Sequence, residues 1–233
     1  MERRKVIGII GAMESETAEL KKKISIDETV KISGIEFLKG KLGETDVILA
    51  KCGVGKVFAA ICAQTMIMKF APDAILNIGV CGALDGRLDL CDVVLGEKTV
   101  QYDMDTSAVG DPVGLISGIN KIYFECDTEI KNKIEEILKR NNINYLCGVV
   151  ATGDRFFNSK ELVESVKSRF SAISGDMESG AIAHACYIND VPFEVLRCIT
   201  DKGDENSGED YKRSLEPATR RLAEIVTALC NEK

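Results

Sequence analysis

The sequence predicts an α/β fold: a three-layer α/β/α sandwich with a central mixed, mostly parallel twisted sheet. Strand-like and helix-like segments alternate along all 233 residues, and no repeat or low-complexity linker interrupts that order. Hydrophobic residues make up 45% of the chain, which suits a sizeable core, and α/β chains of this length often remain undivided. We therefore expect one domain spanning residues 1–233.

The first part of the chain predicts a strand, a helix and a pair of strands. Lys5–Ile10 is an apolar run closed by a glycine, which is typical of a buried strand. Glu14–Lys23 carries acids in its first turn and lysines in its last, and both match the helix dipole. Lys31–Lys39 and Asp46–Lys51 predict paired strands, because glycines lie near the turn between them.

The middle of the chain continues the alternation. Lys56–Lys69 predicts a helix that stops before Pro72, since the residue preceding a proline disfavours helical backbone. Ala74–Gly79 is a short apolar run typical of a buried strand, and Val93–Tyr102 predicts another. Asp127–Arg140 has the apolar spacing of an amphipathic helix.

The last part of the chain predicts two strands and three helices. Tyr145–Ala151 indicates a strand, Ser159–Ser168 a helix, and Phe193–Thr200 a further strand. Met177–Ile188 predicts a helix of unusually small residues, which implies close packing on both of its sides. Tyr211–Cys230 closes the chain with a helix.

The composition argues against nucleic acid and membranes as partners. The formal charge is −7 and the pI is near 5.0, whereas a nucleic-acid groove needs clustered Lys and Arg. The short basic cluster Glu2–Lys5 is explained as the solvated start of the first strand. The longest apolar candidate, Val57–Met68, is shorter than the roughly 18 residues of a membrane span and contains Gln64. No signal-peptide cleavage site follows the first strand.

Cysteine and histidine usage favours a reducing cytoplasm and argues against a metal centre. The nine cysteines form no Cys-x-x-Cys pair, and Cys62, Cys186 and Cys198 stand in apolar runs, where cysteine packs as a small hydrophobe. The single histidine, His184, lies among small residues in a predicted helix and indicates packing rather than zinc binding. No dinucleotide or phosphate-loop glycine motif is complete, so we expect no metal and no cofactor.

A fold of this class binds its ligands outside the carboxyl ends of its strands. Acids follow three of the predicted ends, although by position alone Glu16 could be a surface cap and Asp201 a turn former. Glu178 opens an apolar helix, so we expect it to be at least partly buried, where an acid needs a partner such as a ligand hydroxyl. Phe156 is a candidate stacking plate for a flat base, although it could instead anchor its loop. The predicted strands whose carboxyl ends should surround the ligand end at Ile10, Ile78, Ala151, Ser174 and Ile199.

The motifs at these strand ends occur together in one enzyme family. The matching segments span nearly the whole chain: Ile7–Glu14 with Glu16, Gly53–Val57, Asn77–Gly79 through Gly82, Gly153-Asp154 with Phe156, Met177-Glu178 with Ala181–His184, and Val191–Phe193 to Arg197 and Thr200-Asp201. On these motifs the chain resembles the 5′-methylthioadenosine/S-adenosylhomocysteine nucleosidases of the nucleoside phosphorylase–hydrolase superfamily. The Met-Glu pair followed by a strand that ends in Asp is highly specific.

The resemblance implies a nucleoside phosphorylase-like fold and a homodimer in which the neighbouring subunit lines the 5′ part of the pocket. It also implies hydrolysis of the N-glycosidic bond of 5′-methylthioadenosine and S-adenosylhomocysteine to adenine and the 5′-thioribose, with 5′-deoxyadenosine as a further candidate substrate. On this basis Asp201 protonates N7 of adenine, Glu16 activates the water, and Glu178 binds the ribose hydroxyls. The other expected substrate-binding residues are Met177 on the ribose, Phe156 on the adenine, Phe157 at the base edge, and Ala12, Met13, Val80, Cys81, Gly82, Asp176, Arg197 and Thr200.

The chemistry of N-glycosidic cleavage suits these residue types. Positive charge develops on the sugar and negative charge on the departing base, so a protonated carboxyl near the base and carboxylates near the sugar stabilise the transition state. Two other functions remain open. A nucleoside phosphorylase would need cations around phosphate, yet residues 11–20 contain no Lys or Arg. A non-catalytic nucleoside-binding regulator would have no need of Asp201.

Four features depart from the family pattern. Val80 replaces a small hydroxyl residue, Asp176 replaces a commoner Glu, and Val109 stands where an aromatic commonly lines the 5′-alkylthio pocket. The loop Tyr102–Gly110 is one residue shorter. Because Val109 and the shorter loop leave space, we expect the pocket to accept both a methylthio and a homocysteinyl group.

Overall fold

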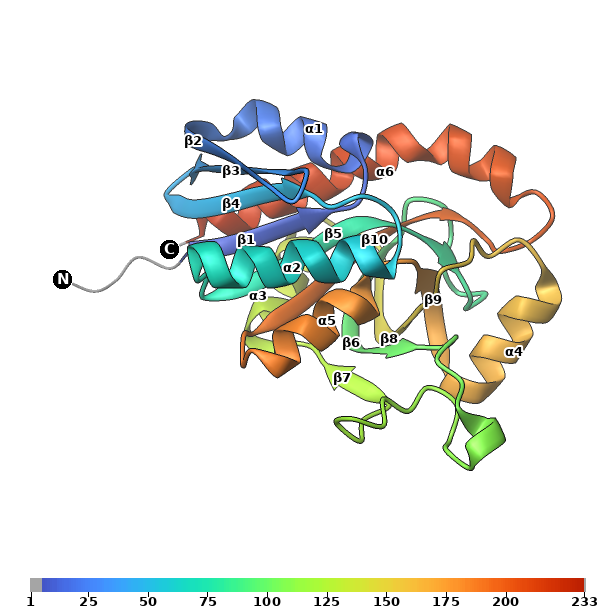
Figure 1. Cartoon of the computed structure of the whole chain (residues 1–233). Helices are drawn as coiled ribbons and strands as arrows, with labels where there is room; N and C mark the ends of the chain where they lie inside the picture. The colour runs from blue at the N-terminus through green and yellow to red at the C-terminus, as the bar shows by residue number, and fades with distance from the viewer. Residues whose placement is uncertain (1–5, 233) are drawn as a thin grey trace.

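The computed structural model of the chain describes residues 6–232 and shows one twisted sheet with helices on both faces (Figure 1). Helices α1 and α6 cover one face, and helices α2 and α5 cover the other (Figure 1). The expected layered α/β/α architecture with a mixed sheet is therefore confirmed. Lys5 and the basic cluster Glu2–Lys5 lie outside the described residues.

The predicted strands and helices occur in the predicted order, and the structure adds strands at Ser25–Ile32, Tyr123–Glu125 and Ala172–Asp176, for which no strand range was predicted. The strands are β1 (Val6–Gly11), β2 (Ser25–Ile32), β3 (Ile35–Leu42), β4 (Thr45–Lys51), β5 (Ala74–Ala83), β6 (Val93–Gln101), β7 (Tyr123–Glu125), β8 (Tyr145–Thr152), β9 (Ala172–Asp176) and β10 (Phe193–Asp201). The helices are α1 (Glu14–Lys23), α2 (Lys56–Phe70), α3 (Thr128–Arg140), α4 (Lys160–Phe170), α5 (Ser179–Ile188) and α6 (Ser207–Asn231), with a short 3-10 helix η1 (Ser107–Val109).

The strand pairing brings several carboxyl ends to one place. The central strands β4, β1, β5 and β10 run parallel, while β2, β3 and β4 form an antiparallel meander at one edge. Strand β5 also pairs with β9, and β10 pairs with β6, so β5, β10, β6, β8 and β9 close on themselves. The ends of β1, β5, β9 and β10 therefore converge at one opening of the sheet.

Alternating side chains along each strand build two cores. On β1, Ile9 faces the side of α6, while its neighbour Ile10 faces the side of α2 and α5. Both are fully buried, and burial of a side chain of this size contributes about 1.5–3 kcal/mol to stability. These two cores hold the strand ends, and the site residues they carry, in fixed positions.

Several element boundaries differ from the prediction. The segment Lys31–Lys39, predicted as one strand, contains a hairpin turn, because Ser33 and Gly34 both adopt left-handed backbone (φ 52° and 81°). The preceding strand β2 is polar and mostly exposed, so it lacked an apolar pattern. Helix α5 begins at Ser179 rather than Met177, and α6 begins before Tyr211.

Within residues 6–232, no helix is long and apolar enough to cross a membrane.

Candidate active site

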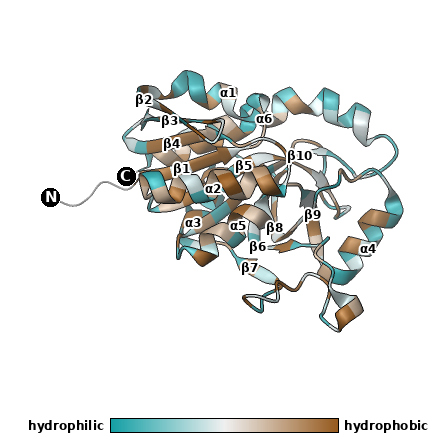
Figure 2. Cartoon of the chain, in the orientation of Figure 1, coloured by the Kyte–Doolittle hydropathy of each residue, from teal (hydrophilic) through white to brown (hydrophobic). Residues whose placement is uncertain are grey.

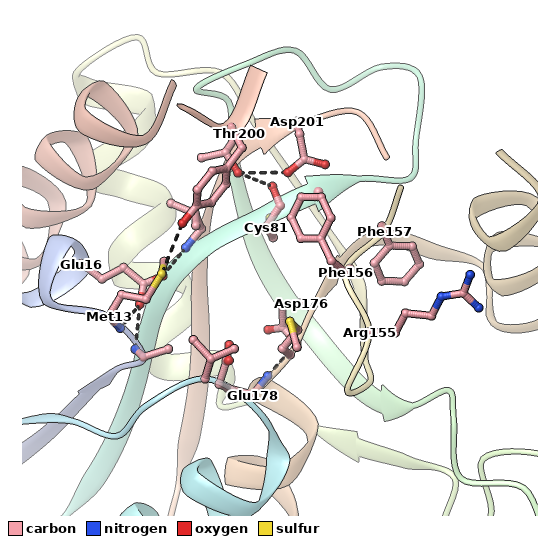
Figure 3. Close-up of a pocket in the computed structure, with 17 residues that line it drawn as sticks. Met13, Glu16, Cys81, Arg155, Phe156, Phe157, Asp176, Glu178, Thr200 and Asp201 are labelled. Carbon is pink, nitrogen blue, oxygen red and sulfur yellow. Dashed lines mark hydrogen bonds between the residues drawn. The ribbon is translucent and has the colours of Figure 1, made fainter. Parts of the chain in front are cut away.

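A cavity of about 270 Å³ opens where the carboxyl ends of β1, β5, β9 and β10 meet (Figure 3). Thirteen of the fourteen residues expected from the sequence line it; they are Ala12, Met13, Glu16, Val80, Cys81, Gly82, Phe156, Phe157, Asp176, Met177, Glu178, Thr200 and Asp201. The fourteenth, Arg197, lies behind the wall of the cavity and not in it.

Glu16 is held in the cavity wall by three backbone amides. One carboxylate oxygen accepts hydrogen bonds from the amides of Ala12 and Met13 at 2.7 and 2.9 Å, and the other accepts one from Val80 at 2.9 Å. Glu16 does cap α1, because it accepts the amide of the N-cap residue Met13, but it is only 2% exposed and is therefore not a surface residue. Burial raises its pKa, against the opposing charge of Arg197 and the three amides. A carboxylate fixed in this way is a preorganised proton acceptor.

Two glycines of β5 make room for the acidic side chains. A Cβ on Gly79 would collide with a guanidinium nitrogen of Arg197 and would lie 2.5 Å from a carboxylate oxygen of Glu16. A Cβ on Gly82 would lie 2.9 Å from a carboxylate oxygen of Asp201. Strand β5 therefore needs glycine at both positions so that these side chains can approach its backbone.

Asp201 ends strand β10 and points into the cavity across from Glu16 (Figure 3). It is 2% exposed, and it accepts hydrogen bonds from the Gly203 amide at 3.1 Å and the Thr200 hydroxyl at 3.2 Å. Burial raises the pKa of Asp201, although these two hydrogen bonds act in the opposite direction. A carboxyl with a raised pKa beside a cavity can act as a proton donor.

Glu178 lies at the base of the cavity, between a helix terminus and a buried arginine. It accepts a hydrogen bond from the Gly55 amide at 3.0 Å, and its other oxygen lies 3.6 Å from the Arg197 guanidinium. It is 5% exposed, which confirms the expected burial. Burial raises the pKa of Glu178 to about 7, although Arg197 opposes the effect.

Asp176 and Arg197 form the buried support beneath Glu178. Their charged groups are 2.7 Å apart with both side chains fully buried, and Arg197 also donates to Asn77 at 2.7 Å. Asp176 accepts hydrogen bonds from the Thr152 hydroxyl and the Ser179 amide, so it caps α5 in place of Glu178. Asp176, Glu178 and Glu16 thus share the positive charge of Arg197, so this arginine is already paired with the protein's own carboxylates.

The upper wall of the cavity is aromatic. Phe156 is 41% exposed and meets the ring of Tyr211 edge-on, with centroids 6.2 Å apart. The Tyr211 hydroxyl lies 3.3 Å from the Met13 sulfur. Phe157 is buried, and it packs on the Tyr102 ring at 5.2 Å. An exposed ring on a cavity wall suits stacking against a flat base, while Phe157 anchors the loop.

Two loops of the cavity are tied together from outside. The Lys56 ammonium lies 2.5 Å from Asp103, and Asp103 accepts a hydrogen bond from the Asp154 amide at 2.9 Å. Asp154 in turn accepts one from the Lys56 amide at 2.8 Å, at the start of α2. This network fixes the loop of Val54 against the loop of Phe156.

Four lining residues escaped the sequence prediction: Val54, Arg155, Gly175 and Tyr211. Val54 lies inside the Gly53–Val57 motif and Gly175 directly precedes Asp176, so both could have been predicted from these motifs. Arg155 directs its side chain away from Phe156 (Figure 3). Tyr211 enters from α6, far along the chain, and no local pattern marks it. Within residues 6–232, no group of three or more His, Cys, Asp or Glu side chains is arranged to hold a metal ion.

Comparison with known proteins identifies the family. Residues 6–231 match the family model described as the phosphorylase superfamily. The chain belongs to the phosphorylase superfamily. Within this superfamily it groups with the 5′-methylthioadenosine/S-adenosylhomocysteine nucleosidases. The chain is 34% identical to the nucleosidase of a Geobacillus species, over 96% of this chain and 97% of the relative. It is also 34% identical to the nucleosidase of Staphylococcus haemolyticus, over 96% of this chain and 98% of the relative.

Solved structures agree with this membership of the superfamily. A Helicobacter pylori 5′-methylthioadenosine/S-adenosylhomocysteine nucleosidase variant with 5′-methylthioadenosine in its active site has a TM-score of 0.95 and 31% identity, covering 99% of this chain and 100% of that one. The futalosine hydrolase of Helicobacter pylori has a TM-score of 0.94 and 31% identity, covering 98% of each chain.

Proposed function

We propose that this protein is an N-glycosyl hydrolase that cleaves 5′-methylthioadenosine and S-adenosylhomocysteine to adenine and the free 5′-thioribose. The observation that carries the proposal is the placement of Glu16, Glu178 and Asp201 around one cavity with an exposed aromatic ring. Family membership supports the same reaction. Residues 1–233 then form a single nucleosidase domain.

Asp201 is the proposed general acid. Its raised pKa favours the protonated form, and a proton given to N7 of adenine neutralises the charge that develops on the leaving base. Phe156 is placed to stack on that base, and the backbone of Phe157 to read its edge. The Thr200 hydroxyl keeps the Asp201 carboxyl oriented.

Glu16 is the proposed acceptor of the water proton, and Glu178 the proposed ligand of the ribose diol. A carboxylate held by three amides keeps its geometry as the sugar cation forms. Glu178 and Met177 lie at the base of the same cavity, where the ribose would bind. The roles predict different phenotypes: Glu16→Gln should retain substrate binding while hydrolysis is lost. A parallel collapse of binding would make Glu16 a structural residue.

Water is the proposed nucleophile, because the negative charge of the cavity acids disfavours phosphate. A phosphate dianion beside Glu16 and Glu178 would be repelled by like charges in a partly desolvated cleft. This repulsion would weaken phosphate binding by roughly several kcal/mol. Arg197 cannot offset this, because it lies behind the wall and pairs with Asp176.

Product analysis tests the reaction. With 5′-methylthioadenosine as substrate, we expect adenine and free 5′-methylthioribose, at a rate that is unchanged when phosphate is omitted. A ribose 1-phosphate product, formed faster as phosphate rises, would make the protein a phosphorylase. Absence of any adenine would favour a non-catalytic nucleoside-binding regulator. S-adenosylhomocysteine, 5′-deoxyadenosine and futalosine complete the substrate panel, the last because a futalosine hydrolase shares the fold.

A homodimer is proposed from the exposed apolar surface over α2 and α5. Val57, Ile61 and Met68 on α2 and Ile188 on α5 are all exposed, and these two helices pack side by side with brown outer faces in Figure 2. Val109 is 81% exposed and does not line the chain's own cavity, which fits a role in a neighbouring subunit's pocket. Light scattering should show a dimer that Ile61→Glu weakens; a monomeric wild type would contradict the proposal.

We also propose a reducing, cytoplasmic location. All nine cysteines are free, and seven of them are buried.

A further inference from the structure

Two cysteines far apart in the sequence meet beside strand β10. Cys91 lies in the connection between β5 and β6 and is partly exposed, whereas Cys198 is fully buried on β10. The Cys198 thiol donates a hydrogen bond to the Cys91 carbonyl oxygen at 3.4 Å, which brings the two cysteines into direct contact. Neither residue lines the cavity of the active site.

The backbone holds the two thiols together. The Cys91 amide donates to the Ile199 carbonyl at 2.8 Å, and the Ile199 amide donates to the Asp92 carbonyl at 2.9 Å. Arg221 of α6 donates to the Cys91 carbonyl as well. Cys91 has a left-handed φ of 67°, a conformation that non-glycine residues rarely adopt and that often marks a functional position.

We propose that Cys91 and Cys198 form a peroxide-oxidisable dithiol, in which Cys91 reacts first and Cys198 closes the disulfide. A redox-sensitive cysteine is typically accessible, has thiolate character and adjoins a resolving thiol. Cys91 meets these conditions: it is partly exposed and adjoins the Cys198 thiol, and the neighbouring Cys198 and the charge of Arg221 lower its pKa to about 6, against partial burial and Asp92.

The proposed chemistry balances with hydrogen peroxide as the oxidant. The Cys91 thiolate attacks one peroxide oxygen, the O–O bond breaks, and hydroxide leaves, so that Cys91 becomes a sulfenic acid. The Cys198 sulfur then attacks the Cys91 sulfur and displaces hydroxide, which takes the Cys198 proton and leaves as water. The product is a disulfide that links the β5–β6 connection to β10.

Cys147 provides a matched control within the same chain. It is also partly exposed, but burial and the adjacent Glu135 carboxylate raise its pKa to about 12. Cys147 donates its hydrogen bond to Glu135 at 3.2 Å and therefore stays a thiol. Cys91 and Cys147 are both partly exposed, so a difference in their rates of oxidation would reflect the different pKa values of the two thiols.

The test is peroxide treatment of the reduced full-length protein, followed by alkylation and peptide mass spectrometry. We expect a Cys91–Cys198 linked peptide pair, reversed by dithiothreitol, with Cys91 consumed about ten-fold or more faster than Cys147. In Cys198→Ala, Cys91 should react more slowly, because the neighbour that lowers its pKa is gone, but its sulfenic acid should persist and be trapped by dimedone. Cys147→Ser should still form the disulfide.

Three results would overturn the proposal, and the wild-type protein alone suffices to obtain them. They are equal consumption of Cys147 and Cys91, a sulfenic acid at Cys91 that never yields the disulfide, and linkage of Cys91 to another cysteine.

Discussion

Replacing Gly79 with alanine should damage both stability and turnover, because the new methyl group has no room. The Cβ would lie 2.5 Å from a Glu16 carboxylate oxygen and closer still to a guanidinium nitrogen of Arg197. Both atoms belong to buried, hydrogen-bonded groups, so neither can yield as a flexible surface side chain would. The backbone of Gly79 is extended within β5, so the effect is steric and not conformational.

The expected magnitude follows from these contacts. Overpacking a well-packed interior costs about 1–3 kcal/mol. In a chain of this size each kcal/mol lowers Tm by about 2–4 °C, so a fall of roughly 2–12 °C is expected. A shift of Glu16 by about 1 Å is enough to lower turnover by ~10²-fold, because proton transfer depends on that geometry.

The assay compares adenine release and thermal unfolding for wild type, Gly79→Ala and a matched control, Gly86→Ala. A Cβ on Gly86 would meet nothing within 4 Å, so the control should behave as wild type. The steric reasoning is refuted if Gly79→Ala keeps wild-type turnover and Tm.

Three further substitutions test individual carboxyl groups. Asp201→Asn should lower adenine release by ~10²-fold or more, because the amide cannot donate the proton; near-normal turnover in folded protein would sink the assignment. Removing the substrate's 2′-hydroxyl should be costly in wild type and nearly neutral in Glu178→Ala, and equal penalties in both would refute the ribose contact. Glu194 is fully buried, and burial raises its pKa well above the ordinary value. Its contribution to stability should be present below about pH 4.5 and decline as pH rises toward the folded-state pKa. Urea unfolding of Glu194→Gln should accordingly show a smaller loss of stability with rising pH than wild type, and parallel pH profiles would contradict this.

The sequence predicted the layered fold because its strands are apolar and its helices carry dipole-matched ends. It missed β2 because that strand is an exposed edge, in which polar residues such as Asp27, Glu28 and Thr29 give no core-facing pattern. The Ser33-Gly34 turn did carry a local signal, since such pairs commonly mark turns. The start of α5 was misplaced because Asp176, outside the helix, caps the Ser179 amide.

The site residues at the ends of strands could be predicted from the sequence. The residues that reach the site through the packing of distant elements could not. Glu16, Glu178 and Asp201 each follow a strand, so the topology alone places them together. Tyr211 reaches the cavity from α6, and its position depends on how that helix packs across the sheet. Arg197 stands in a buried strand four residues before Asp201, a spacing that would put both side chains on one face of a regular strand. The strand is irregular between Ile199 and Asp201, and Arg197 pairs with Asp176 behind the cavity wall, which the sequence pattern did not indicate.

The place of Arg197 bears on which nucleophile the site can admit. Were the guanidinium in the cavity wall, it would offer a phosphate dianion the bidentate partner that such an anion needs. Behind the wall its charge is engaged by Asp176 at 2.7 Å and Glu178 at 3.6 Å, and its hydrogen bonds go to Asn77 and Ser179. Arg197 also stabilises the buried carboxylates of Asp176 and Glu178. A buried carboxylate that lost its partner would destabilise the fold by roughly 3–5 kcal/mol. One buried cation thus stabilises Asp176 and Glu178 from behind the wall, without placing its guanidinium where a phosphate could bind it.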